Sequence, residues 1–292
     1  MIKTSRIAHL ILETCEFDRQ LDHYERVIGL RVIHREDGVA YLATKLGQLA
    51  LILKSKGTTK CTNVTFELGP KADLAEARRH LIKQNIHAEL RSDVYPGIGA
   101  LVAFADPTGS TIELLNNVPF HEAGVVSGIG PHKLGHLAFI VEDPKAITVF
   151  YSEILGFRVS DWIEDYFVFL RCGPDHHTLN FVRGAPVRMH HVAFELRDAS
   201  QLIESCELLA RNGTPILWGP VRHGPGHNMA IYHRDPAGGI IELFTELDRM
   251  SSEELGYFDP VPWHTDRPQY PKVWAGKERR DIWGPEVPAD FL

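Results

Sequence analysis

The chain has 292 residues, a length that suits one large domain or two domains of about 125 to 150 residues that each bury a core of their own. Hydrophobic residues make up 44% of the sequence and charged residues 24%, and no apolar run is long enough to span a bilayer. The formal net charge of -7 is spread without a cluster of Lys and Arg, which argues against a nucleic-acid partner.

The first predicted element is a strand over residues 7–12, and its sequence pattern returns later in the chain. RIAHLILET (6–14) aligns with KLGHLAFIV (133–141) at an offset of 127 residues. Further blocks pair in the same order: YERVIGLRV (24–32) with YSEILGFRV (151–159), NVTFEL (63–68) with HVAFEL (191–196), and DPTGSTIELL (106–115) with DPAGGIIELF (235–244). Four matched blocks at nearly constant spacing indicate an internal duplication.

The second copy gives the clearest secondary-structure prediction. Its helices are expected over 144–155, with Pro144 in the first turn and Gly156 at the end, and over 199–212, closed by Gly213. Strands are expected over 133–141, near 157–161, 166–171 and 177–182, and over 190–196, 230–233 and 240–244. The fold class is therefore α+β, with each copy built from two βαβββ units.

The repeat divides the chain into three parts. Residues 1–125 form the first module, residues 126–250 form the second, and residues 251–292 lie outside the repeat. The last segment is rich in Pro, Trp and charge, and is too aromatic for an ordinary disordered tail. We expect it to fold back over a module.

Metal-ligand candidates in the second module are His136, His191 and Glu242, which occupy equivalent strand positions of the repeated units. Residues two apart on a strand share a face, so all three are expected on one cupped sheet surface. A lone histidine on a strand is more often a core or surface residue than a ligand. Together, however, two imidazoles and one carboxylate form the ligand set of non-haem iron, which leaves coordination positions open.

The first module offers an internal comparison. His9 matches His136 and Glu113 matches Glu242, but Asn63 stands where the second module has His191. Asparagine is a poor ligand for a divalent transition metal compared with imidazole. The first module is therefore expected to have lost its metal site, leaving His9 and Glu113 as hydrogen-bonded polar groups of the core.

These residues carry a family resemblance that covers residues 5–248 and is strongest in the second module. GHLAF (135–139), HHVAFEL (190–196), GPVRHG (219–224) and AIYHRDPAGGIIELF (230–244) resemble the motifs of type I extradiol dioxygenases of the vicinal oxygen chelate superfamily, in particular catechol 2,3-dioxygenases. The tail segment KERRDIWGPEVP (277–288) resembles that of homoprotocatechuate 2,3-dioxygenase, which helps to enclose the active site.

The resemblance implies two tandem vicinal oxygen chelate modules and an oxidoreductase of aromatic catabolism. Fe(II) would be the cofactor, with Mn(II) able to occupy the same ligands, and O2 the co-substrate. Both oxygen atoms would be inserted next to the vicinal diol of a catechol, giving a product of the 2-hydroxymuconic semialdehyde type. The resemblance also implies a homo-oligomer, commonly a tetramer. The location follows from the cysteines, because four cysteines without C-x-x-C spacing fit reduced thiols in a cytoplasmic protein.

Three catalytic residues are also implied. His177 in DHHTLNF matches the family's catalytic histidine, with His176 as a weaker candidate, and His223 in VRHG matches the histidine that contacts substrate and oxygen. Tyr232 is supported independently, because Tyr232 and Glu242 are equidistant from Ala237 in the DPAGG turn and a hairpin would place them side by side. His190 alternates away from His191, so it is expected to pack or to meet solvent, without a metal role.

The sequence also bears on the ring substituent of the substrate. Trp218 occupies the position of an arginine that holds the substrate carboxylate in homoprotocatechuate enzymes, whereas Arg280 matches a second such arginine. An aromatic side chain in place of a guanidinium favours stacking or apolar contact. We expect a neutral or apolar-substituted catechol, with Phe169 and Trp218 in the pocket wall and Arg280 near the substrate.

Two other functions use the same modules. A glyoxalase-like metal isomerase would share the fold, but its usual ligands include more carboxylate and do not predict His177, His223 and Tyr232 together. A binding protein of the bleomycin-resistance type would need no metal, and the complete ligand set of the second module argues against it.

Overall fold

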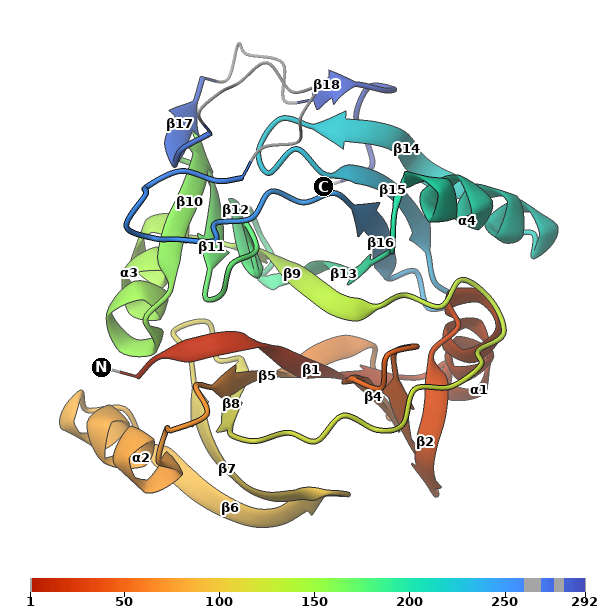
Figure 1. The fold of residues 1–292 in the computed structure, drawn as a ribbon. Helices are drawn as coiled ribbons and strands as arrows, with labels where there is room; N and C mark the ends of the chain where they lie inside the picture. The colour runs from red at the N-terminus through yellow and green to blue at the C-terminus, as the bar shows by residue number, and fades with distance from the viewer. Residues whose placement is uncertain (1, 260–268, 276–280, 292) are drawn as a thin grey trace.

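The computed structural model describes residues 2–259, 269–275 and 281–291. Two curved mixed sheets lie one above the other, with helices at their ends (Figure 1). Among the residues that it describes, no helix is long and apolar enough to cross a membrane.

The first sheet contains eight strands from the first half of the chain. In spatial order they are β2 (Arg31–Glu36), β3 (Val39–Ala43), β4 (Leu49–Ser55), β1 (Thr4–Thr14), β5 (Lys60–Leu68), β8 (Thr111–Leu115), β7 (Ile98–Ala105) and β6 (Ala88–Tyr95). The helical elements are α1 (Phe17–Asp22), the π-helix η1 (His23–Ile28) and α2 (Leu74–Lys83). The central pair, β1 and β5, is antiparallel.

The second sheet repeats this arrangement and adds a strand at each edge. Its ten strands, in spatial order, are β17 (Lys272–Trp274), β10 (Arg158–Ile163), β11 (Phe167–Arg171), β12 (Leu179–Arg183), β9 (Lys133–Val141), β13 (Arg188–Glu195), β16 (Ile240–Thr245), β15 (Met229–Arg234), β14 (Ile216–His223) and β18 (Asp281–Trp283). The helices are α3 (Pro144–Leu155) and α4 (Ala199–Arg211). Without the edge strands, the order matches the first sheet strand for strand, which confirms the predicted fold class.

The segment beyond the repeat supplies both added edge strands. β17 pairs in parallel with β10, and β18 pairs antiparallel with β14. In Figure 1 these two strands lie at the top of the second module, on the side away from the first. Both described strands of this segment therefore lie against the second sheet.

Helix α3 illustrates how local sequence sets the element boundaries. The Asp143 carboxylate accepts from the backbone N–H groups of Lys145 and Ala146, and Pro144 occupies the first turn, where no N–H is needed. Gly156 ends the helix with a φ of 73°, a left-handed conformation that glycine adopts without a Cβ penalty. The predicted bounds of this helix and of the strand over 133–141 are both confirmed.

The two modules share an apolar core. Strands β1 and β5 lie below β9 and β13 (Figure 1), and one cluster of buried side chains includes Leu10 and Phe66 from the first module with Leu137 and Phe194 from the second. The rings of Phe66 and Phe157 pack edge to face, with centroids 5.3 Å apart. Burial of these faces against each other is a non-directional stabilisation that grows with the apolar area removed from water.

Two tyrosines, one from each module, each donate a hydrogen bond to a carboxylate of the other module. Tyr24 of η1 donates to the Asp235 carboxylate of the second module at 3.4 Å, and Tyr151 of α3 donates to the Asp106 carboxylate of the first at 3.0 Å. All four residues are buried. Burial, followed by the neighbouring carboxylate, raises the pKa of each phenol well above its usual value, so both hydroxyls remain donors.

Substitution of Tyr151 by Phe should weaken the interface between the modules. The change removes one hydrogen bond to a buried carboxylate and should lower the free energy of unfolding by about 1–3 kcal/mol. Urea denaturation followed by circular dichroism would measure the loss. Tyr270→Phe is the matched control, because Tyr270 is exposed. Equal stability of the Tyr151→Phe and Tyr270→Phe proteins would refute this role of the tyrosine.

Candidate metal centre

The three predicted ligands converge in the middle of the second sheet. His136 lies on β9, His191 on β13 and Glu242 on β16, which are consecutive strands in the sheet order. His136 Nε2 lies 2.9 Å from Glu242 Oε2, and His191 Nε2 lies 3.1 Å from the same oxygen. The two Nε2 atoms are 3.4 Å apart. Within the described part of the chain, this is the only group of three His, Cys, Asp or Glu residues close enough to hold a metal ion.

Strand register explains why these side chains meet. Ala193 is paired with His136 on one side and with Glu242 on the other. His191, two residues before Ala193, points to the same face. Ala193, the residue between His136 and Glu242, has only a methyl side chain. Gly135 adds to the packing, since a Cβ there would collide with the Phe244 ring, which lies 4.9 Å from the His136 ring by centroid distance.

The electrostatics of the cluster favour a cation. Burial alone would raise the pKa of Glu242, but its interactions with His136 and His191 hold that pKa well below the usual range. Burial lowers the pKa of His191, which therefore stays neutral near pH 7. Asn228 donates to Glu242 Oε1 at 3.0 Å, leaving Oε2 for the two imidazoles. The cluster thus presents the negative charge of Glu242 beside the neutral imidazole of His191.

A divalent metal ion fits this donor set. All three side chains are buried, and a buried carboxylate without a compensating charge is costly. Two histidine nitrogens and one carboxylate oxygen are the ligands of non-haem iron sites that keep open positions. We conclude that His136, His191 and Glu242 are able to bind a metal ion such as Fe(II) or Mn(II).

His223 and Tyr232, two of the predicted catalytic residues, form one hydrogen-bonded pair beside the ligands. His223 Nε2 lies 2.8 Å from the Tyr232 hydroxyl, and His223 Nδ1 lies 2.8 Å from Asp281 Oδ1. Tyr232 stands directly opposite Glu242 in the β15–β16 hairpin, as its distance from the turn predicts. Burial, followed by the charge of Glu242, raises the pKa of Tyr232 well above its ordinary value, so the hydroxyl stays protonated.

The neighbouring histidines His176 and His177 have different surroundings. His177 lines the pocket next to the ligands, with its ring centroid 4.3 Å from that of His136. His176 points instead toward Asp161, with Nε2 3.2 Å from Oδ2. Burial, followed by the nearby His136, lowers the pKa of His177 well below its usual value. The pocket position favours His177 over His176 for direct contact with a small molecule.

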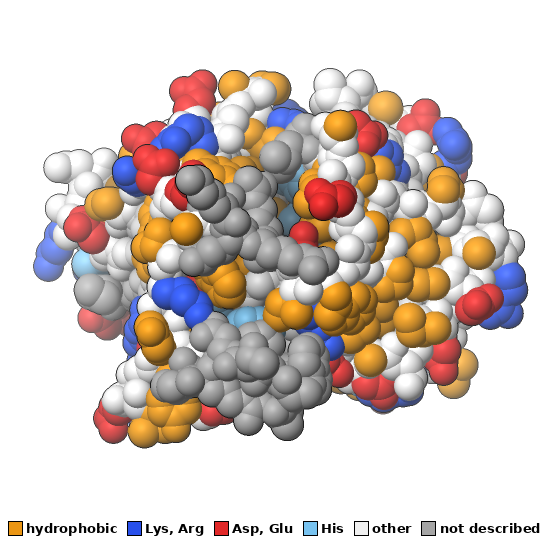
Figure 2. Space-filling view, turned by 90° about the horizontal axis from the view of Figure 1, so that it is seen from above, with side chains coloured by type: hydrophobic (Ala, Val, Ile, Leu, Met, Phe, Trp, Pro, Cys, Tyr) orange, Lys and Arg blue, Asp and Glu red, His pale blue; other side chains and the backbone are white. Residues whose placement is uncertain are grey.

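An apolar pocket of about 110 Å³ opens in front of the ligands. Phe167 and Phe169 stack in one wall with centroids 4.5 Å apart. Trp218 lies in another wall, stacked on Tyr232 at 5.1 Å. Histidine atoms are visible in hollows bordered by hydrophobic side chains on the face that Figure 2 presents. Phe169 and Trp218 therefore occupy pocket walls as predicted, whereas Arg280 lies outside the described residues.

Several pocket residues were not predicted from the sequence. Asp281 and Phe291 come from the tail, and Asn228 follows VRHG by four residues. His190 packs, which is one of its two expected environments, but it does not alternate away from His191, because the two Nδ1 atoms lie 2.7 Å apart. The cause is a register irregularity of β13 at this point, which breaks the simple alternation of side chains.

At the equivalent place in the first module, the side chains form hydrogen bonds with one another. The Glu113 carboxylate accepts from Asn63, Thr65 and Tyr95, each at 2.8 Å. Thr65 also lies 3.1 Å from His9 Nε2 and stands where the second module has the smaller Ala193. As expected from Asn63, these groups form a hydrogen-bonded polar core, in which His9 Nδ1 has no hydrogen-bond partner among the described residues.

Comparison with protein families gives a match over residues 133–243 to the Glyoxalase/Bleomycin resistance protein/Dioxygenase superfamily. Among curated proteins, the chain is 25% identical over 244 residues to Metapyrocatechase 2 of Cupriavidus necator, covering 76% of this chain and 72% of the relative. It is 26% identical over 298 residues to 2,2',3-trihydroxybiphenyl dioxygenase of Sphingomonas paucimobilis, covering 94% and 97%.

Solved structures share the fold. The Mn(II)-bound glyoxalase from Novosphingobium aromaticivorans superposes with a TM-score of 0.85 at 23% identity, covering 97% of this chain and 92% of the other. Homoprotocatechuate 2,3-dioxygenase from Brevibacterium fuscum, in complex with 3,4-dihydroxyphenylacetate, superposes with a TM-score of 0.84 at 24% identity, covering 99% and 92%. At this level of identity, both structures establish the architecture alone. The activity has to be inferred from the residues of the site.

Buried neutral histidines should make the protein sensitive to acid. Burial, followed by Lys54, lowers the pKa of His9 from 6.5 to about 3. Below pH 6.5 His9 therefore binds a proton in the unfolded chain but not in the folded protein. As a result, the free energy of unfolding falls as the pH drops toward 3. The contribution of His9 is about 1.4 kcal/mol per pH unit over that range.

Urea denaturation at several pH values between 7 and 4.5, with a chelator present, would test this contribution. His9→Asn should make the pH dependence shallower by about one proton, whatever its effect on absolute stability. His34→Asn should leave the dependence unchanged, because His34 is exposed. If the His9→Asn protein kept the pH dependence of the unsubstituted chain, the assignment of this histidine would be wrong.

Proposed function

We propose that this chain, whose residues 133–243 belong to the glyoxalase/bleomycin resistance protein/dioxygenase superfamily, is an extradiol dioxygenase. It cleaves the ring of a catechol next to the vicinal diol and adds both atoms of O2. The product is of the 2-hydroxymuconic semialdehyde type, and the balance of catechol plus O2 requires no external reductant.

One observation carries this proposal. The His136, His191 and Glu242 side chains converge at the base of a small apolar pocket that also contains His177, His223 and Tyr232. A three-residue ligand set leaves positions open for substrate oxygens. An apolar cavity with a few convergent polar groups is the usual form of a small-molecule site.

The three ligands would hold Fe(II), for which Mn(II) can substitute. The bound ion would bring the two catechol oxygens and O2 together and lower the pKa of the catechol hydroxyls. Asn228 holds the Glu242 carboxylate so that one oxygen faces the ligand histidines. The Phe244 ring and Gly135 fix the His136 ring from behind.

His177 acts as the general base. Its lowered pKa keeps the imidazole neutral near pH 7, and its place in the pocket allows it to take a proton from a catechol hydroxyl. The same proton can be returned when the bond between the two atoms of O2 breaks, so no net proton is consumed.

Tyr232 supplies the hydrogen bond to negative charge on the substrate and oxygen atoms, and His223 orients it. The Tyr232 hydroxyl is held protonated, and it exchanges its contact with His223 Nε2 for a substrate oxygen where charge develops. Asp281 accepts from His223 Nδ1–H, which fixes the orientation of the ring and turns Nε2 toward Tyr232.

The ring substituent is neutral or apolar. The pocket walls include Ile163, Phe167, Phe169 and Val182, and Trp218 takes the position of a carboxylate-binding arginine. The Asp281 carboxylate also lines the pocket and would repel an anionic substituent. These contacts support catechol itself or catechols with alkyl or aryl groups.

Assembly, location and module boundaries are part of the same proposal. We assign residues 1–125 to a module without a metal site, residues 126–250 to the catalytic module and residues 251–292 to a tail over the active site. The resemblance supports a cytoplasmic homo-oligomer, with a tetramer as the first expectation.

The activity is tested by anaerobic reconstitution with Fe(II), followed by addition of catechols in air. O2 uptake and a yellow ring-opened product are expected from the unsubstituted chain, and His191→Ala should lower kcat by at least about 1000-fold because the ligand set is incomplete. His34→Ala, a change at an exposed histidine, serves as the matched control. Iron binding without O2 uptake on any catechol would instead support the metal isomerase, and absence of iron binding the metal-free binding protein.

The substrate preference is tested with 4-methylcatechol and 3,4-dihydroxyphenylacetate, which differ by a carboxylate. The value of kcat/KM for 4-methylcatechol should be at least about tenfold higher, because a buried carboxylate beside Asp281 costs free energy. A preference for the carboxylate compound would contradict the apolar assignment while leaving the dioxygenase proposal intact.

A further inference from the structure

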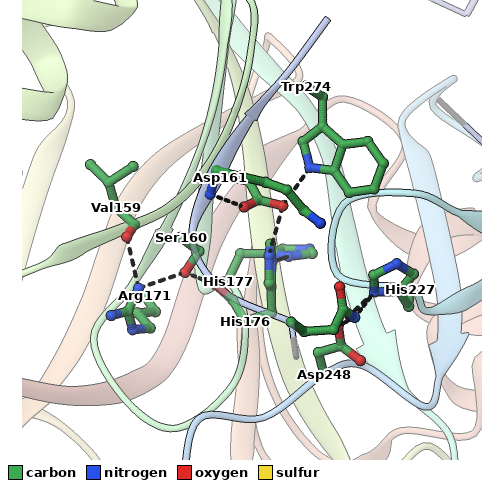
Figure 3. A network of polar contacts seen from close by, with 11 residues as sticks. Val159, Ser160, Asp161, Arg171, His176, His177, His227, Asp248 and Trp274 are labelled. Atoms are coloured by element: carbon green, nitrogen blue, oxygen red, sulfur yellow. Dashed lines mark hydrogen bonds and ion pairs between the residues drawn. The ribbon is translucent and has the colours of Figure 1, made fainter. Parts of the chain in front are cut away.

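A buried chain of three side chains lies behind the proposed base. Asp161 of β10 contacts His176, with Oδ2 and Nε2 3.2 Å apart, and His176 Nδ1 lies 3.0 Å from His177 Nδ1. Figure 3 shows the imidazole of His176 directed at the Asp161 carboxylate. The chain therefore runs from a fixed carboxylate to a residue of the pocket.

These contacts are shielded from solvent. Asp161, His176 and His177 are all buried, and the Phe258 ring covers His176 at a centroid distance of 4.7 Å. The backbone also fixes His176, because its N–H donates to the Asp248 carbonyl and its carbonyl accepts from Ser160. A hydrogen bond in such an environment is strong, and a mismatch of donors and acceptors is costly.

The donors and acceptors of this chain specify one arrangement of protons. The Asp161 carboxylate only accepts, so the proton of a neutral His176 lies on Nε2. His176 Nδ1 then carries a lone pair and must accept from His177 Nδ1–H. A neutral His177 therefore has its lone pair on Nε2, on the side of the ring away from His176.

We propose that His176 is a positioning residue: held by Asp161, it fixes His177 in the tautomer and orientation that present the Nε2 lone pair to the substrate. This inference rests on the proposed function, since it assigns the atom by which His177 acts as a base. Without the acceptor on His176, His177 could place its proton on either nitrogen, and only one form could take a proton from a catechol.

Asp161 is itself held by the tail. It accepts from the backbone N–H of Lys272 at 2.9 Å and from Trp274 Nε1 at 2.7 Å, both on β17. In Figure 3 the Trp274 ring and His176 point to the same carboxylate from different directions. In a purely structural role, Asp161 and His176 would only anchor the tail. Substitutions at His176 can separate this anchoring from control of the His177 tautomer.

Two substitutions of His176 separate the two contacts. In His176→Asn the side-chain oxygen lies near the position of Nδ1, so the acceptor for His177 is kept and the contact with Asp161 is lost. In His176→Gln the amide nitrogen lies near the position of Nε2, so the contact with Asp161 is kept and the acceptor is lost. Trp274→Phe removes one tail contact and leaves the chain of three intact.

Steady-state O2 uptake should distinguish these variants. His176→Gln should lower kcat by about tenfold or more with KM within about twofold, since general-base catalysis is impaired and binding is not. His176→Asn and Trp274→Phe should keep kcat within about threefold. Equal losses of kcat in His176→Gln and His176→Asn, or no loss in His176→Gln, would overturn the proposal. Iron content and thermal unfolding of each variant identify any protein that fails to fold or load.

A second readout does not depend on turnover. In the full chain labelled with 15N-histidine and loaded with diamagnetic Zn(II), nitrogen chemical shifts should place the His177 proton on Nδ1 in the unsubstituted protein and in His176→Asn, and on both nitrogens in His176→Gln. A proton on Nε2 in the unsubstituted protein would overturn the proposal. If no catechol supports O2 uptake, the proposed function fails, while these spectra still decide the tautomer.

Discussion

The Glu242 carboxylate is buried, and the groups around it in the second module have to compensate its negative charge. It lies between two imidazoles in a sheet interior, where an uncompensated charge is costly. A divalent cation satisfies all three groups and still leaves coordination positions open toward the pocket. Strand register, the small Ala193 and the hydrogen bond from Asn228 all serve to bring these donors together.

The two modules surround an equivalent buried glutamate with different side chains. In the first module, Thr65 and Asn63 occupy the positions of Ala193 and His191, and both donate hydrogen bonds to Glu113. The same fold can thus compensate a buried carboxylate in two ways, by a cation in the second module or by neutral hydrogen-bond donors in the first. The first module is left to contribute the shared core and the reciprocal tyrosine bonds that join the two halves.

Period-two alternation and repeat alignment were sufficient to predict the fold class, the helix over 144–155 and the convergence of His136, His191 and Glu242. They predicted that His190 packs or meets solvent, and it packs, but they did not predict its contact with His191, because the irregularity in β13 interrupts the alternation. They also gave no sign of Asp161 and Asp281, since contacts between β10 or β14 and the tail depend on tertiary pairing that local sequence does not encode.

Addition of O2 to a catechol at this ligand set and pocket can be tested by isotope labelling. The measurement is mass spectrometry of the ring-opened product formed by the Fe(II)-loaded chain under 18O2, with a rapid borohydride quench that prevents exchange of the aldehyde oxygen. The product should carry two labelled oxygen atoms. A product without 18O would exclude dioxygenation and would assign the metal centre to a reaction that does not consume O2.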